Sequence, residues 1–270
     1  MTSTSQSAVV WVLEKDAFPQ SHNELKEAVL ANGHGCLEWC DEWLESENPP
    51  VIEGRKVVFH GSLANADAIR RWDRWNPGAF CDTRKFNCSA WYSQARSRLV
   101  NHLWRITTVA DFVANPEAYF EAMGADSVFV RPDGPLKEFS GRVVTRSKLT
   151  LQALDYGYYY EDTALPIVVA PARRIGREWR FVVVSGEVVA GSEYQVDGRL
   201  AIRAAPSLDA WKYAATAALE LDAPEAVYVM DICECAEALC LLEINPFSGA
   251  DLYACDANAV VREVSRALSA

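Results

Sequence analysis

The feature that most constrains this chain is an apolar run near its carboxyl end, AVYVMDICECAEALCLLEIN, from Ala226 to Asn245. Residues of these types, on both sides of a short polar stretch, predict two strands joined by a turn near residues 235–238. Side chains alternate between the two faces of a strand, so Glu243 and Asn245 point the same way. Oxygen-bearing side chains on one face of a buried strand need a partner, which is a cation, a hydrogen-bond network or water.

A third oxygen-bearing side chain belongs to the same hairpin. Folding the hairpin near Ala236 brings Asp231 beside Leu242 or Glu243, and directly opposed residues have Cβ atoms about 5 Å apart. Two carboxylates and the amide of Asn245 form an oxygen-only set of the kind that Mg²⁺ prefers. The alternative is a structural hairpin whose acidic residues lie on a solvated face, and the apolar flanks argue against it.

The amino-terminal third alternates strand and helix patterns. SAVVWVLEKD predicts a strand, SHNELKEAVLANG a helix in which Ser21 and Glu24 fit a capping box, and residues 55–60 a second strand followed by a helix. A further helix is expected over residues 89–104. This alternation is typical of an α/β unit, and we expect it to form an N-terminal domain over residues 1–107.

The second part, residues 108–270, mixes helices with antiparallel hairpins. A helical stretch broken at Pro116 precedes two strands around the loop PDGPLKEFSG, and an apolar strand then ends at Pro171. WRFVVVSGEVVAGSEY predicts a hairpin that turns at residues 185–186. SLDAWKYAATAALEL and DANAVVREVSRALSA predict helices, so the expected fold class is α/β (α+β).

Composition and charge exclude several classes of function. The 270 residues carry a net charge of −11, whereas nucleic-acid binders usually show basic patches, so no nucleic acid is expected as a partner. No apolar run approaches the roughly 20 residues of a membrane helix, and the first residues lack the pattern of a signal peptide. We therefore expect a cytoplasmic protein without a membrane partner, whose eight cysteines are reduced thiols.

Three cations follow or begin apolar strands. Arg131 ends a strand, Lys137 lies in the loop after it, and Arg180 begins another strand. Such cations beside a loop suit a polyphosphate, although each one taken alone is more often a surface charge. The strand before Pro171 also offers backbone groups that suit hydrogen bonding to a purine, which by itself is a weak signal.

Taken in order, these pieces resemble the ATP-grasp superfamily. The combination VRPD, LKEFSG, EWRF and EINPFSGADLY most resembles the clade named for two arginines and a lysine. The resemblance covers about Thr108 to the carboxyl end, and the N-terminal third matches only in class, as the α/β domain that usually precedes. It implies an ATP-grasp fold with a small lobe over residues 108–172, a metal- and substrate-binding lobe over 173–270, and a nucleotide between them. Many members have Lys where Arg131 stands.

The resemblance also implies ATP and Mg²⁺ as cofactors and a role for each matching residue. By that likeness, Arg131 and Lys137 contact the α- and β-phosphates, and Arg180 faces the γ-phosphate and the acyl phosphate. Val169 and Ala170 lie against adenine, and Glu178 lies near the nucleotide. The implied ligands of one or two Mg²⁺ are Asp231, Glu243 and Asn245. Arg180 and Lys137 are the expected catalytic residues.

The activity implied by the resemblance is a carboxylate–amine ligase. It would form an amide or peptide bond through an acylphosphate and release ADP and phosphate, with a small-molecule acid and amine, such as amino acids or a peptide, as substrates. Two alternatives stay open, a small-molecule kinase on the same scaffold and a nucleotide-binding protein without catalysis, and so does the oligomeric state.

Several segments have expected supporting roles. The loop over residues 132–141 is the candidate lid, because an acylphosphate needs protection from water. Tyr194, Arg199 and Arg203 follow the Arg180 hairpin and are candidates to face an acidic substrate, although a solvated loop position is an equally good explanation for each. The aromatic cluster over residues 156–161 is expected to pack between the lobes, and lining of a site is the alternative.

Overall fold

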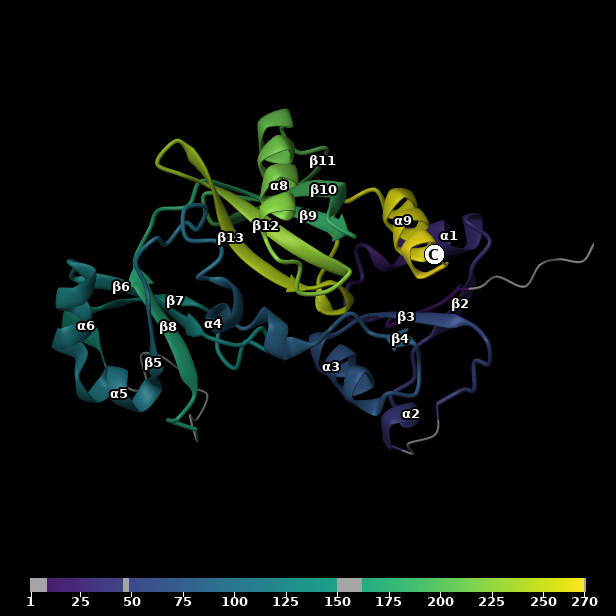
Figure 1. The fold of residues 1–270 in the computed structure, drawn as a ribbon, viewed down its shortest axis with the longest axis horizontal. Helices are drawn as coiled ribbons and strands as arrows, with labels where there is room; N and C mark the ends of the chain where they lie inside the picture. The colour runs from purple at the N-terminus through teal and green to yellow at the C-terminus, as the bar shows by residue number, and fades with distance from the viewer. Residues whose placement is uncertain (1–8, 46–48, 150–161, 270) are drawn as a thin grey trace, which may run out of the picture.

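Three β-sheets follow one another along the longest axis of the molecule (Figure 1). The computed structural model describes residues 9–45, 49–149 and 162–269. The expectation of an aromatic cluster at 156–161 lies outside the described residues. The arrangement of sheets and helices confirms the mixed α/β fold class. In the described part of the chain, no helix has the length and apolarity needed to cross a bilayer.

The first sheet is parallel, with the strand order β2-β1-β3-β4. Its elements are β1 (Val9–Leu13), α1 (His22–Ala31), β2 (Gly35–Glu38), α2 (Glu42–Glu45), β3 (Lys56–His60), α3 (Leu63–Trp72) and β4 (Pro77–Gly78). Every residue of β1 is buried. A continuous apolar strand is typical of a parallel sheet covered on both faces, and here α1 covers one face and α3 the other.

The capping box expected at the start of α1 is not formed. The helix begins where predicted, but the Ser21 hydroxyl makes no cap hydrogen bond. It donates instead to Oδ1 of Asp251 over 3.0 Å. This prediction was wrong because a partner more than two hundred residues away competes for the same hydroxyl.

The five-stranded sheet has the order β11-β10-β9-β12-β13. Its strands are β9 (Arg177–Val184), β10 (Glu187–Val196), β11 (Arg199–Ala204), β12 (Val227–Cys235) and β13 (Ala238–Pro246). Both predicted hairpins are present. The turn between β9 and β10 has positive φ at Ser185 and Gly186, and the turn between β12 and β13 has positive φ at Ala236 and Glu237. These are the conformations that two-residue hairpin turns require.

The two faces of the five-stranded sheet differ. The helix α8 (Leu208–Glu220) covers one face, and its buried residues are four alanines, which let the helix approach the strands closely. The other face is half apolar and half polar. Val182 and Val229 pack toward the first sheet, whereas Arg180 and Asp231 form the polar half.

The first and the five-stranded sheets share one hydrophobic core. The last helix, α9 (Ala257–Ser269), lies beside α1 (Figure 1), and both contribute to a core that includes Trp11, Val229 and Phe247. The short helix η3 (Phe247–Gly249) brings Phe247 into this core. The N-terminal α/β unit is therefore continuous with the carboxyl-terminal lobe through buried apolar contacts.

The third sheet forms the small lobe, with the order β5-β8-β6-β7. Its elements are β5 (Arg105–Thr108), α5 (Val109–Ala114), α6 (Pro116–Met123), β6 (Ser127–Pro132), β7 (Arg142–Thr145), η2 (Arg146–Lys148) and β8 (Pro166–Pro171). The helical stretch is divided at Pro116, as expected. Strand β5 pairs with β8 and spans the division placed at residue 107, so this sheet begins slightly before it.

The helix expected over residues 89–104 is mostly absent. After η1 (Thr83–Phe86), the only described helix in this stretch is α4 (Cys88–Trp91), and turns follow it. Leu99 forms a parallel bridge with Leu241 of β13, in which Val100 N–H donates to the Leu241 carbonyl over 3.0 Å. This long-range pairing at the sheet edge replaces the local helical hydrogen bonds, and the prediction was wrong for that reason.

Candidate active site

Asp231 and Glu243 lie directly opposite each other on β12 and β13. The next pair in the ladder is Ile232 with Leu241, so Leu242 is an extra residue in β13. This bulge selects one of the two registers that the sequence allowed. Because opposed residues lie on one face, the two carboxyl groups share the polar half of the five-stranded sheet.

Arg180 binds the carboxylate of Asp231 from the neighbouring strand. Its Nε donates to Oδ1 over 2.8 Å and its Nη2 to Oδ2 over 2.7 Å, while Nη1 donates to the Asp251 carbonyl over 2.9 Å. Asp231 is fully buried. Burial raises the pKa of Asp231, and the charge and hydrogen bonds of Arg180 oppose that rise. All three guanidinium nitrogens are therefore engaged.

Two tyrosine rings hold the guanidinium group in place. Tyr194 and Tyr253 stack with centroids 4.7 Å apart and an interplanar angle of 6°. The Cζ of Arg180 lies 5.6 Å and 5.1 Å from their centroids, within the range of cation–π contact. Tyr194 also donates its hydroxyl to Glu178 over 2.7 Å. Burial raises the pKa of Glu178, and this hydrogen bond acts against the rise.

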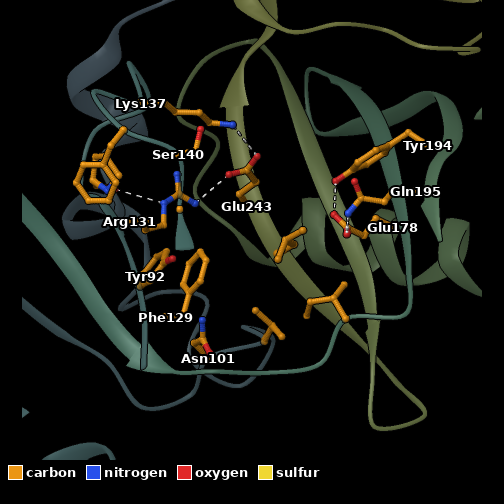
Figure 2. Close-up of a pocket in the computed structure, with 16 residues that line it drawn as sticks. Tyr92, Asn101, Phe129, Arg131, Lys137, Ser140, Glu178, Tyr194, Gln195 and Glu243 are labelled. Atoms are coloured by element: carbon orange, nitrogen blue, oxygen red, sulfur yellow. Dashed lines mark hydrogen bonds and ion pairs between the residues drawn. The ribbon is translucent and has the colours of Figure 1, made fainter. Parts of the chain in front are cut away.

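Glu243 forms ion pairs with two cationic side chains of the small lobe. Nη1 of Arg131 on β6 lies 2.9 Å from Oε2, and Nζ of Lys137 lies 3.3 Å from Oε1. Figure 2 shows the carboxylate between the two cations. Burial alone would raise the pKa of Glu243, but Lys137 and Arg131 outweigh it and hold the pKa well below its usual value. Glu243 thus joins the two lobes by ion pairs.

Asn245 follows on the same strand and is 7% exposed. It lies close enough to Glu243 to help lower the pKa of that carboxyl group, yet its buried Nδ2 has no well-formed hydrogen bond within the described residues. This Nδ2 is a donor and cannot bind a cation, but the amide oxygen of the same side chain, with the two carboxylates, forms the oxygen set that a hard cation such as Mg²⁺ takes. Across the described ranges, no three His, Cys, Asp or Glu side chains are grouped to hold a metal. A metal here would therefore depend on the amide as well as on Asp231 and Glu243.

A cavity of about 370 Å³ separates the small lobe from the five-stranded sheet. Its lining residues are Tyr92, Val100, Asn101, Phe129, Arg131, Pro132, Lys137, Phe139, Ser140, Gly141, Ile175, Glu178, Tyr194, Gln195, Leu242 and Glu243. Charged groups gather around Glu243, whereas Val100, Phe129, Ile175 and Leu242 supply apolar walls. A ligand with one charged end and one apolar end would match this lining.

The residues expected from the sequence divide into three groups by position. Those that line the cavity are Arg131, Lys137, Glu178, Tyr194 and Glu243. Those on the polar face of the five-stranded sheet, outside the cavity lining, are Arg180, Asp231 and Asn245. Those buried in β8 are Val169 and Ala170. Ile175, in the segment between β8 and β9, lines the cavity in their place. Arg199 and Arg203 lie on β11 and do not line it.

Sequence reasoning did not single out Tyr92, Asn101, Phe129 or Gln195 as cavity residues. Tyr92 and Asn101 come from the stretch that was expected to be helical, and no spacing in it signals a position beside β13. Phe129 was detectable, because it lies two residues before Arg131 on one strand and so shares its face.

The loop expected as a lid is anchored at both ends. Asp133 accepts hydrogen bonds from the Ser89 backbone N–H and hydroxyl, each over 2.7 Å. Phe139 is buried in the small-lobe core. At Gly141 an added Cβ would lie 2.6 Å from Cζ of Phe129, so the loop passes tightly over the cavity wall. Lys137, with positive φ, lies between these anchors.

Comparison with solved structures gives the same fold over nearly the whole chain. The D-cycloserine synthetase DcsG is 16% identical, with a TM-score of 0.66 and coverage of 96% of this chain and 99% of that chain. The ATP-grasp ligase PsnB, complexed with minimal precursor, is 14% identical, with a TM-score of 0.60 and coverage of 97% and 99%. The D-alanine–D-alanine ligase from Bacillus anthracis, complexed with ATP, is 11% identical, with a TM-score of 0.62 and coverage of 98% of both chains.

Sequence comparison identifies the family. No curated protein sequence matches this chain. The model of an ATP-grasp domain, family 2 of the clade named for two arginines and a lysine, matches residues 108–262, which is more than half of the chain and includes the cations and acids around the cavity. The chain therefore belongs to the ATP-grasp family, in that two-arginine, one-lysine clade.

Proposed function

We propose that this protein is an ATP- and Mg²⁺-dependent carboxylate–amine ligase that forms an amide or peptide bond through an acylphosphate and releases ADP and phosphate. The observation that carries the proposal is the pair of facing carboxylates, Asp231 and Glu243, each paired with a cation, of which Glu243 lines the cavity between two lobes and Asp231 is buried beside it. The neighbouring structures in this fold include a synthetase and two ligases, one of them in complex with ATP.

The charged side chains of the site suit a nucleoside triphosphate with its metal ion. Arg131 and Lys137 now neutralise Glu243, and a phosphate chain would compete with Glu243 for both cations. The carboxylate that is released, together with Asp231 and the amide of Asn245, would then hold the metal. When bound, Mg²⁺ neutralises charge on the phosphate oxygens during phosphoryl transfer.

The reaction would proceed in two transfers. A substrate carboxylate attacks the γ-phosphorus of ATP, and the bond to the β-phosphate oxygen breaks, giving an acylphosphate and ADP. The amine attacks the acyl carbon and phosphate leaves with one oxygen of the original carboxylate. Arg180 and Lys137 would stabilise the developing negative charge, because positioned cations act strongly where water is excluded.

The loop between Asp133 and Gly141 would exclude that water. Phe139 anchors the loop in the small-lobe core, and Lys137 at its centre reaches Glu243 of the other lobe. Exclusion of water matters because hydrolysis of an acylphosphate wastes ATP. Lys137, which would bind phosphate, therefore belongs to the same loop that would cover the intermediate.

The test is a screen of ATP consumption with Mg²⁺ against pairs of amino acids and small carboxylic acids, read by mass spectrometry. The confirming pair is then repeated with ¹⁸O in the acid. Ligation predicts dependence on both acid and amine and the transfer of one ¹⁸O to free phosphate. A kinase would release no phosphate and leave a stable phosphorylated product, and this result would exclude the ligase.

A matched pair of variants links the activity to the site. Glu243→Gln keeps the shape of the side chain but removes its charge, and should abolish turnover in the pair found by the screen. Glu237→Gln makes the same change at the exposed turn of the same hairpin and should leave turnover unchanged. Equal activity of the two variants would contradict the proposed site.

A further inference from the structure

Asn101 occupies a fixed position in the wall of the cavity. The residue before it, Val100, donates its N–H to the Leu241 carbonyl over 3.0 Å, and Leu241 donates to the Arg98 carbonyl over 2.7 Å. These bonds hold the segment against β13 next to Leu242, which also lines the cavity. The backbone therefore positions Asn101 without help from its side chain.

The amide of Asn101 lacks the partner that a buried polar group normally has. The residue is 7% exposed, and its Oδ1 is buried and accepts no hydrogen bond from the described residues. Leaving such an acceptor unpaired is costly, and most buried polar atoms have a partner. The terminal torsion of asparagine is broad, so the amide can turn its edge to a ligand.

The two ends of the cavity differ, because the charged side chains lie at one end and the amide of Asn101 lies at the other. Phe129 and Arg131 are two residues apart on one face of β6, and Lys137 lies beyond Arg131. In Figure 2, Asn101 lies beside Phe129, at the opposite end from Lys137. Phosphates bound at Arg131 and Lys137 would therefore leave the base of a nucleotide at the apolar end with Asn101.

We infer that Asn101 is a specificity-determining residue that reads the 6-amino and N7 edge of adenine, an inference that rests on the proposed function. An asparagine amide pairs with this edge by accepting from the 6-amino group and donating to N7. Guanine presents two acceptors there, O6 and N7, so the carbonyl of the amide would face another oxygen. The unpaired Oδ1 is thus the acceptor that an adenine amino group satisfies.

The experiment measures binding of nucleotides to the full chain by calorimetry with Mg²⁺ and no second substrate. The probes are ATP, purine riboside triphosphate, which lacks the amino group, and 7-deaza-ATP, which lacks N7. Wild type should bind each altered nucleotide about 5- to 150-fold more weakly than ATP, the range for a buried hydrogen bond lost from one side. The comparison needs no mutation, so it does not depend on any variant folding.

The variant Asn101→Leu assigns the effect to this side chain. It should weaken ATP, which loses both hydrogen bonds, more than purine riboside triphosphate, which loses only the bond to N7, so that the preference between them falls below about threefold. Asn23→Leu, at an exposed position of α1, is the control and should retain the wild-type preference. Thermal unfolding of both variants verifies that they are folded, and Asn101→Ser replaces the leucine variant if it is not.

The outcomes separate this inference from the proposed function. A wild-type preference that survives in Asn101→Leu, or equal binding of ATP and 7-deaza-ATP by wild type, would overturn the role of Asn101 and leave the nucleotide site standing. Absence of binding of any of the three nucleotides to wild type would overturn the proposed function, and the inference with it.

Discussion

Replacing Asp231 by Asn tests the buried ion pair beneath the candidate site. The side chains of Arg180 and Asp231 are 9% and 0% exposed, and two hydrogen bonds of 2.8 Å and 2.7 Å join them. The variant keeps the shape and removes the negative charge, so Arg180 remains buried without a counterion. Breaking a buried pair from one side costs about 3–5 kcal/mol.

The expected readout is the midpoint of thermal unfolding. For a chain of this size, 1 kcal/mol corresponds to about 2–4 °C, so Asp231→Asn should lower Tm by about 6–20 °C. The measurement is made by circular dichroism in EDTA, so that no metal contributes. The control is Glu263→Gln, which removes a half-buried acid paired with the exposed Arg262 and Arg266 at the surface of α9, and should change Tm little.

A double variant distinguishes loss of the pair from loss of packing. Adding Arg180→Met to Asp231→Asn removes the unpaired charge, so the double variant should be more stable than the sum of the two single changes predicts. Purely additive losses, or a Tm of Asp231→Asn equal to that of wild type, would refute the reasoning that this pair is buried and mutually dependent.

Two further predictions concern the loop and the acidic residues of the fold. In Gly141→Ala, the loss of ATP-binding free energy in a titration should exceed the loss of unfolding free energy derived from Tm. The reason is that the added Cβ would lie 2.6 Å from Cζ of Phe129 and displace the loop. An unchanged affinity would contradict this. Burial raises the pKa of Glu225 from 4.5 to about 7, so the folded state retains a proton that the unfolded state releases, and stability should fall as pH rises through that window. Glu225→Gln should remove this part of the pH dependence in urea unfolding, and an identical slope would count against it.

Local chemistry made much of the fold predictable. The hairpin turns were readable because Ser185-Gly186 follows an apolar strand, and the break between α5 and α6 because Pro116 cannot continue a helix. Strand β1 was readable as a continuous apolar run. Each of these signals lies within a few residues of the structure it specifies.

The errors have the opposite character. Residues 92–104 have helix-like spacing of apolar side chains, and several of them are indeed buried, but Leu99 pairs with Leu241 instead of continuing a helix. Ser21 fits a cap by sequence, yet its hydroxyl is used by Asp251. In both places the deciding partner is distant in the chain, and nothing local reveals it.

The candidate site combines both situations. The alternation of β13 placed Glu243 and Asn245 on one face, and the hairpin turn brought Asp231 to that face. Nothing in the sequence indicated which cation each carboxylate takes, because Arg180 is 51 residues from Asp231 and Arg131 is 112 residues from Glu243. The pairing of these carboxylates with these cations has a consequence for the proposed function. Two carboxylates paired with three cations already balance to within one charge, so phosphates and a divalent metal that enter together preserve that balance, whereas either alone would break ion pairs without replacing them.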